Sequence, residues 1–354
     1  MRRNLSRRVV LKAVALSAAV ASLSHKLRGL ETESSDQIFA DFIRPPDDTR
    51  PWVYWYFMDG NLTREGMDAD LFAMKRAGLG GAIYLEVGIG IKPGPVNFMS
   101  EQWQELLAHA FAEADRLGLK MSLAAGPGWC GAGGPWVKPD QSMQHLVFSR
   151  TDVEGPASLD AQLPQPQPRT PFFGIDTLTP ELFKLWKEFY RDEFVLAFPT
   201  PVEGASIRDI DEKALYTRGS YSSQIPGPYT KRPWVRPFLT SKDSYPAVPS
   251  EECIASGKVV NLSEKLDPDG KLLWMVPPGK WTILRFGRTL TGQTTRPAPK
   301  PGLGLETDKF NAAAMDAHFN AYIAPLIERI GARQHPGRGL VALHYDSWEM
   351  SSQN

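Results

Sequence analysis

The final residues of the sequence combine carboxylates with an aromatic side chain. An apolar run, 340–343, leads into Asp346, Trp348 and Glu349. Aromatic cover and a neighbouring carboxylate both raise the pKa of an acidic group, which a catalytic proton donor requires. Glu349 is therefore a candidate general acid, with Asp346 and Trp348 as candidate substrate-binding residues. An acidic residue after a buried strand is more often a helix cap or a loop anchor, so the residues alone leave this role open.

Further polar and aromatic side chains follow apolar runs earlier in the chain. The candidate substrate-binding residues there are Asp59, Asn61, Glu86, Trp129 and Trp136. Carboxylates can bind vicinal hydroxyl groups of a sugar, and an indole can cover the apolar C–H side of its ring. Cleavage of a glycosidic bond needs one carboxyl group as acid and a second that activates water or attacks the sugar. The set therefore indicates carbohydrate chemistry, provided that one fold brings these residues together.

The elements that would position these residues alternate between strand and helix. Strand-type runs lie at 51–57, 80–87 and 119–126. Thr63 and Ser100 are the predicted N-caps of two helices between them, because each precedes apolar residues at helical spacing. Short connections from strand to helix to strand indicate parallel pairing through right-handed crossovers.

The same alternation returns near the end of the chain. Asp308 is the predicted N-cap of a third helix, which should end at Gly331 and be followed by a strand over 339–345. The predicted apolar stripe of this helix consists of Met315, Phe319, Tyr322 and Leu326.

Residues 151–301 interrupt this alternation. They are rich in Pro, Ser and Thr and contain short β-type runs at 193–198, 271–276 and 280–287, with turn signals between them. We therefore predict an inserted antiparallel β module. The expected organisation is a leader at 1–30, a linker at 31–48, three strands with their helices at 49–150, the β-rich module at 151–301, and the third helix and fourth strand at 302–354.

The predicted fold class is α/β: the first half of a (β/α)8 TIM-type barrel, interrupted by an antiparallel β domain. An open doubly wound sheet is the alternative. Its glycine-rich phosphate turn is missing after the first strand, where residues 58–63 contain one glycine. Half a barrel leaves parallel strand edges unpaired, so we expect the remaining strands to come from sequence beyond Asn354 or from another chain.

The N-terminus resembles an export signal. A basic start contains Ser-Arg-Arg at 6–8, which resembles a twin-arginine motif, and an apolar stretch follows at 13–21. This stretch is shorter than the ~20 residues that span a bilayer, so we expect no stable membrane anchor and a periplasmic or secreted protein. The two cysteines, Cys130 and Cys253, give no disulfide framework.

The composition is that of a globular protein with a sizeable core. Apolar residues make up 42% of the chain, charged residues 23%, and the formal net charge is zero. Because the chain carries no net positive charge, nucleic acid is not an expected partner. The six histidines show no zinc-ligand spacing.

Five separated segments carry a resemblance to a known family. They are 51–87, 124–149, 279–292, 302–309 and 344–350. Taken in this order, they resemble glycoside hydrolase family 106, the α-L-rhamnosidases. The resemblance implies a (β/α)8 barrel interrupted by β domains, inversion at the anomeric carbon, a rhamnose-containing oligosaccharide or glycoside as substrate, and calcium at the rhamnose hydroxyls.

The resemblance also assigns residue roles. The family's Asp-Ser-x-Glu motif matches Asp346 to Glu349, which implies that Glu349 is the general acid. The general base would lie beyond Asn354, and the chain alone would then be inactive. The family pattern has Asn at the position of Asp59. A non-catalytic sugar-binding remnant, or a barrel glycosidase of another sugar specificity, is the alternative reading.

Overall fold

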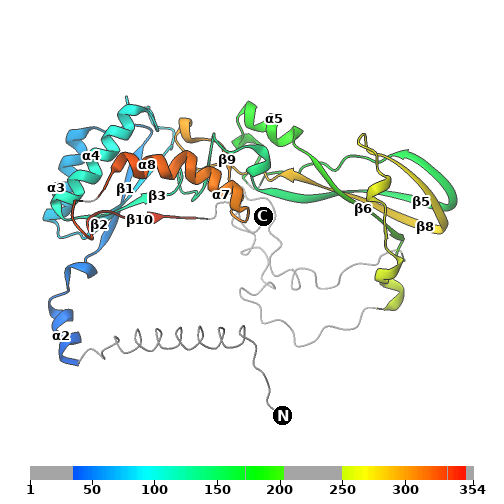
Figure 1. The fold of residues 1–354 in the computed structure, drawn as a ribbon, viewed down its shortest axis with the longest axis horizontal. Helices are drawn as coiled ribbons and strands as arrows, with labels where there is room; N and C mark the ends of the chain where they lie inside the picture. Colours follow the sequence, from blue (N-terminus) through cyan, green and yellow to red (C-terminus); the bar gives the residue numbers. More distant parts are fainter. Residues whose placement is uncertain (1–34, 172, 203–248, 333, 348–354) are drawn as a thin grey trace, which may run out of the picture.

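A computed structural model describes residues 35–171, 173–202, 249–332 and 334–347. The predicted leader, Trp348 and Glu349 lie outside these residues. Figure 1 shows two sheets, with the parallel one at the left and the antiparallel one at the right. The α/β class predicted from the sequence is confirmed as this combination of a parallel and an antiparallel sheet.

The parallel sheet has four strands in the order β1-β2-β3-β10. Its strands are β1 (Trp52–Met58), β2 (Gly81–Val87), β3 (Lys120–Ala124) and β10 (Gly339–His344). Each strand pairs in parallel with its neighbour in the sheet. Among the described residues β1 and β10 are the two edges of this sheet, so closure into a barrel is not seen.

Two helices cover one face of the parallel sheet. Helix α3 (Arg64–Arg76) begins after Thr63, whose Oγ1 accepts a hydrogen bond from the Gly66 amide. Helix α4 (Glu101–Leu117) begins after Ser100, whose Oγ accepts from the Trp103 amide. Both predicted N-caps are thus confirmed. The inward residues of the two helices share one hydrophobic core with the sheet: Met67, Leu71, Trp103, Leu107, Ala110 and Ala114.

The third helix differs from its prediction at its start. Asn311 rather than Asp308 is the N-cap of α7 (Ala312–His318), and its side chain accepts from the Ala314 amide. Asp308 instead accepts from the Phe310 amide in the turn before the helix. Both residue types suit an N-cap, and the sequence does not show which one the chain geometry selects.

The helix continues from α7 through a π-helical turn, η9 (Phe319–Ile323), into α8 (Ala324–Ile330). A π turn holds more residues than an α turn and therefore rotates the inward face. The predicted apolar stripe is wrong at Phe319, which is 44% exposed. His318 and Ile323 are buried in its place.

The antiparallel sheet has the order β5-β8-β6-β7. Its strands are β5 (Gln144–Gln162), β8 (Lys271–Leu290), β6 (Arg191–Pro199) and β7 (Val260–Asn261). Strand β5 begins before residue 151, where the inserted module was predicted to start. Helix α5 (Pro180–Glu188) lies between β5 and β6 in sequence, and the short strands β4 (Gly133–Gly134) and β9 (Leu305–Glu306) pair with each other.

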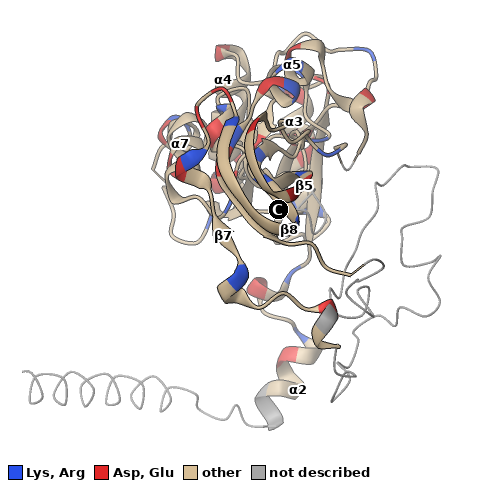
Figure 2. Ribbon diagram, turned by 90° about the vertical axis from the view of Figure 1, so that its right-hand side faces the viewer, with Lys and Arg blue, Asp and Glu red and all other residues tan. Residues whose placement is uncertain are grey.

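The remaining described elements are short. Helix α2 (Ser35–Ile43) lies apart from both sheets in Figure 1. The 3-10 turns are η1 (Asp47–Thr49), η2 (Pro139–Gln141), η3 (Ile175–Thr177), η5 (Ser250–Glu252), η6 (Ser256–Lys258), η7 (Ser263–Lys265) and η8 (Lys300–Gly302). Within the described ranges, every helix is too short or too polar to cross a membrane. Figure 2 shows Lys and Arg interspersed with Asp and Glu over the elements in view.

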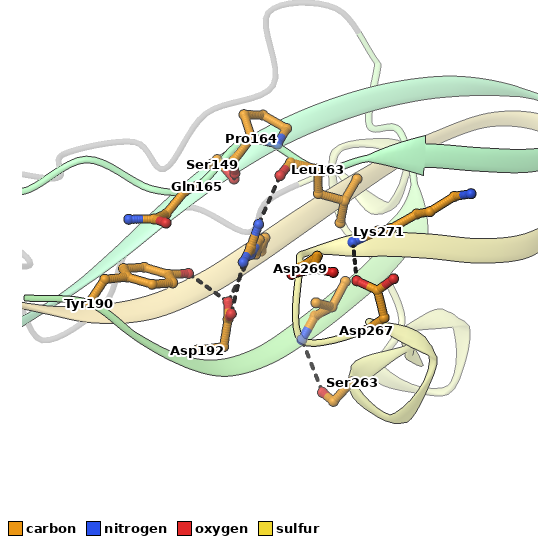
Figure 3. Close-up of polar contacts among 12 residues, drawn as sticks. Ser149, Leu163, Pro164, Gln165, Tyr190, Asp192, Ser263, Asp267, Asp269 and Lys271 are labelled. Atoms are coloured by element: carbon orange, nitrogen blue, oxygen red, sulfur yellow. Dashed lines mark hydrogen bonds and ion pairs between the residues drawn. The ribbon is translucent and has the colours of Figure 1, made fainter. Parts of the chain in front are cut away.

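The Arg285 side chain joins strands β8 and β6 to each other and to the segment after β5. The Arg285 guanidinium on β8 donates to both carboxylate oxygens of Asp192 at 2.8 Å and to the Leu163 carbonyl at 2.8 Å. Tyr190 donates to the same carboxylate at 2.6 Å, as Figure 3 shows. The Arg285 side chain is only 5% exposed. A planar guanidinium with this many partners fixes strand and loop together.

Candidate active site

Strand β1 has one buried and one exposed face. Trp55 and Phe57 are buried in the core shared with the helices, whereas Tyr54 and Tyr56 are 47% and 38% exposed. Successive residues of a strand point to opposite faces. The two tyrosines therefore lie on the sheet face that α3 and α4 do not cover, which we call the open face. The spacing of Tyr54 and Tyr56 in the sequence already carried this signal, but the sequence analysis did not select them.

An aromatic and acidic cluster lies on the open face. The rings of Tyr54 and Tyr56 stack with centroids 5.4 Å apart, and Tyr54 Oη lies 3.5 Å from His344 Nε2 at the end of β10. His344 Nε2 lies 3.9 Å from Asp346 Oδ2. Partial burial, followed by the charge of Asp346, raises the pKa of Tyr56 above its ordinary value. Asp346, one of the predicted substrate-binding residues, is therefore close to this tyrosine.

Trp129 joins this cluster from the loop after β3. Its indole lies beside the Tyr56 hydroxyl, where it opposes the rise in the Tyr56 pKa, and is 40% exposed. Its amide donates to the Arg296 carbonyl, and its carbonyl accepts from the Ser347 amide at 3.1 Å. The structure thus brings Trp129 and Asp346 together, and adds Tyr54, Tyr56 and His344 to the candidate site.

Asp59 and Asn61 hold the loop after β2. One carboxylate oxygen of Asp59 accepts from the amides of Ile89, Gly90 and Ile91 at 3.0, 3.0 and 3.2 Å. Asn61 Nδ2 donates to the carbonyls of Met58 and Lys92. These contacts stabilise a loop at the carboxyl end of the sheet, and the sugar contact predicted for the two residues stays a prediction.

Glu86 lies on the helix-covered face and not on the open face. It pairs in register with Phe57, is 3% exposed, and accepts from Trp103 Nε1 at 2.5 Å and Tyr84 Oη at 3.3 Å. Its other oxygen has no hydrogen-bond partner among the described residues. Burial raises the pKa of Glu86 to about 7, against the lowering effect of these hydrogen bonds. The structure does not bring Glu86 together with the cluster on the open face, and the sugar contact predicted for it stays a prediction.

The sequence of β2 does not show on which face Glu86 lies. All but one of its residues are buried, so both of its faces are covered. A strand buried on both sides has no apolar–polar alternation, and its sequence does not show which face a given residue occupies.

Trp136 is partly buried and packs against the hydrophobic core. Its Nε1 donates to His318 Nδ1 at 3.0 Å, and its ring stacks on Tyr322 with centroids 5.4 Å apart. Trp136 and Trp129 lie in one loop, but only Trp129 reaches the cluster on the open face. The sugar contact predicted for Trp136 is therefore not supported by its position. Cys130, between them in sequence, is buried and accepts from the Arg296 amide.

The predicted general acid follows this cluster in sequence. Ser347, the last described residue, donates to Asp346 Oδ1 at 3.3 Å, and Trp348 and Glu349 lie outside the described residues. The part of the chain that the structure describes contains no group of three or more His, Cys, Asp or Glu side chains that could hold a metal ion. The calcium that the resemblance implies stays a prediction, with its ligands unassigned.

Comparisons with known proteins agree with this architecture. A protein of Formosa agariphila named "Putative beta-glucuronidase" is 34% identical over 295 residues, which is 83% of this chain and 22% of that protein. The structure of a rhamnosidase from Novosphingobium sp. PP1Y superposes with a TM-score of 0.61 at 23% identity, over 86% of this chain and 39% of that one. The second likeness shows the fold. The chain spans well under half the length of either protein.

The family assignment comes from a sequence profile. The profile of Glyco_hydro_106, described as alpha-L-rhamnosidase, matches residues 43–354, which include the parallel sheet, the antiparallel sheet and the cluster on the open face. This chain therefore belongs to glycoside hydrolase family 106, the alpha-L-rhamnosidase family.

Proposed function

We propose that this chain forms the N-terminal part of an inverting α-L-rhamnosidase that releases terminal rhamnose from plant or microbial glycans or glycosides. One observation carries the proposal: the chain matches the family from residue 43 to 354, and its open face gathers Trp129, Tyr56 and Asp346 at the carboxyl ends of parallel strands. In barrels built from such strands, active sites lie at that end.

The proposed sugar contacts follow from the chemistry of the cluster. The rings of Trp129 and Tyr56 offer apolar surface to the C–H face of a pyranose and to the methyl group of a 6-deoxy sugar. The Asp346 carboxylate accepts hydrogen bonds from sugar hydroxyls. His344, near both Tyr54 and Asp346, adds a group that can donate or accept.

Glu349 is the proposed proton donor to the leaving oxygen. It follows Asp346 by three positions, and a nearby negative charge favours the protonated form of a carboxyl group. Inversion requires a second carboxylate about 6.5–9.5 Å away, with a water molecule between it and the sugar. We assign this base to sequence beyond Asn354, because the chain covers only 39% of the solved rhamnosidase chain. The 354 residues alone are then expected to be inactive.

Calcium and export remain part of the proposal. Calcium would bind the rhamnose hydroxyls through oxygen ligands that the described residues do not supply as a cluster. The twin-arginine-type segment at 6–8 supports secretion or a periplasmic location.

The general acid is tested with two aryl α-L-rhamnosides that differ in leaving group. In the full enzyme, Glu349→Gln should lower kcat/KM at least about 100-fold for a poor leaving group, which needs protonation, and far less for 4-nitrophenolate. Glu328→Gln, an exposed glutamate on α8, is the matched control. Equal losses on both substrates, or none on the poor one, would disprove the assignment.

Two alternatives are tested in the same assay. The name of the Formosa agariphila relative makes 4-nitrophenyl β-D-glucuronide a necessary second substrate. Hydrolysis of the glucuronide but not the rhamnoside would replace the proposed substrate class. Rhamnose binding without hydrolysis by the full product would favour a non-catalytic sugar-binding protein.

A further inference from the structure

The loop after β3 needs an internal anchor. Trp129 stands on its outer part, on the open face, while its later residues return to the interior and pair as β4 with β9. Most of the residues from 125 to 136 lie in turns and bends. The backbone of Trp129 is held by Arg296 and Ser347, and the two ends of the loop are held by separate contacts.

His318 contacts both ends of this loop. Its Nε2 lies 2.7 Å from the Ala125 carbonyl at the start. Its Nδ1 lies 3.3 Å from the Gly133 amide and 3.0 Å from Trp136 Nε1 at the end. The side chain is completely buried. One imidazole ring thus joins three polar groups of the loop to the helix.

These contacts fix the tautomer of the ring. Nδ1 faces two N–H donors and must carry the lone pair, and Nε2 faces a carbonyl oxygen and must carry the proton. Burial lowers the pKa of His318 to about 4, so the neutral form is kept at ordinary pH. A second proton would place an N–H group against two other N–H groups.

A π-helical turn lies next to the His318 ring. It begins directly after His318 and turns Tyr322 toward Trp136, so that both residues contact the same indole. Isolated π turns inside α-helices are frequent at functional sites because they re-aim side chains.

We infer that His318 is a positioning residue: its neutral ring ties the two ends of the loop after β3 and thereby holds Trp129 on the open face. The sugar-binding consequence rests on the proposed function, because only a sugar site there gives Trp129 a substrate. The tie itself does not, since it is a property of the loop.

The tie is tested by hydrogen exchange of the full chain. His318→Phe keeps a ring but removes all three contacts, and His318→Asn keeps an acceptor at the place of Nδ1. Ile323→Val, a buried change in the same π turn, is the matched control for general destabilisation. We expect exchange in 125–136 to become about tenfold faster in His318→Phe, with His318→Asn in between and Ile323→Val unchanged. Equal exchange in His318→Phe and Ile323→Val would overturn the inference.

The second measurement is titration with L-rhamnose in the same proteins. Affinity should fall about tenfold in His318→Phe and recover in part in His318→Asn. Faster exchange with unchanged rhamnose affinity would reduce His318 to a purely structural role and overturn the positioning claim. If the unaltered protein binds no rhamnose, the proposed function fails, and the exchange comparison still decides whether His318 ties the loop.

Discussion

Tyr54 Oη and His344 Nε2 lie 3.5 Å apart although they belong to the two edge strands of the parallel sheet. Strands β2 and β3 separate β1 from β10, and neighbouring strands are about 4.8 Å apart, so a flat sheet would hold the edges roughly 14 Å apart. Two side chains on the same face can meet over that span when the sheet curves toward them. The contact therefore makes the open face concave, as the inner wall of a barrel would be.

The concave cluster predicts which aromatic residues bind a sugar. Trp129→Ala or Tyr56→Ala should weaken L-rhamnose binding about tenfold each, ~1.4 kcal/mol, because each removes a ring that can cover the sugar. Trp129→Phe, which keeps a smaller ring, should lose less. Phe183→Ala changes an exposed aromatic residue on α5 and should leave affinity unchanged. Calorimetric titration measures all four, and unchanged affinity in both alanine variants would remove the cluster from the sugar site.

The loop after β2 predicts a role for Asp59 that does not depend on substrate. Asp59→Ala removes the acceptor for the amides of residues 89–91 and places alanine at a φ of 50°, so we expect a loss of about 2–3 kcal/mol in the free energy of unfolding. Asp59→Asn keeps a carbonyl acceptor and suits that φ, so its loss should be smaller. Urea unfolding and hydrogen exchange of the loop provide the measurements. Wild-type exchange in the alanine variant would contradict this account.

Sequence patterns predicted local features correctly. They failed where contacts with other parts of the fold determine the structure. Thr63 and Ser100 were readable as N-caps because the helix that follows each one is regular. Asp308 and Asn311 are both good caps, and the choice between them depends on the turn that delivers the chain to α7. The π turn after His318 leaves no periodic pattern in the sequence. The residues of the following helix that face the core could therefore not be predicted.

The site shows the same division. The run containing Tyr54 and Tyr56 alternates, so its two faces could be read. The run containing Glu86 is buried on both sides, so its sequence does not show which residues lie on which face. Trp129 and Trp136 belong to one loop of turns, and only the packing of Trp136 against Tyr322 separates the partly buried tryptophan from the exposed one.

Two ion pairs of the antiparallel sheet should contribute very differently to the free energy of unfolding. Asp192→Ala leaves the buried Arg285 guanidinium without its carboxylate, which should lower the free energy of unfolding by about 3 kcal/mol. Asp160→Ala breaks the Lys271 pair, in which both side chains are about half exposed, and should cost less than about 1 kcal/mol. Denaturant unfolding compares the two. Similar losses would mean that the Arg285 pair is as solvated as the surface pair.

The buried Glu86 carboxyl group should make the folded chain less stable as the pH rises. Its pKa is about 7 in the folded chain, raised mainly by burial, against an ordinary value of 4.5. Between these values the folded state binds the proton and the unfolded state does not, so stability falls as pH rises from 4.5 to 7. The charged form should cost about 3 kcal/mol above pH 7 and nothing below 4.5.

Glu86→Gln removes this dependence while keeping an acceptor for Trp103. The variant should therefore be more stable than the unaltered chain at pH 8, by up to about 3 kcal/mol, and close to it at pH 5. Glu105→Gln changes an exposed glutamate on the same helix as Trp103 and should leave the pH profile as it is. Urea unfolding at several pH values gives the three curves. If the curve of Glu86→Gln runs parallel to that of the unaltered chain from pH 5 to pH 8, the carboxyl group is not held in the apolar layer between β2 and α4.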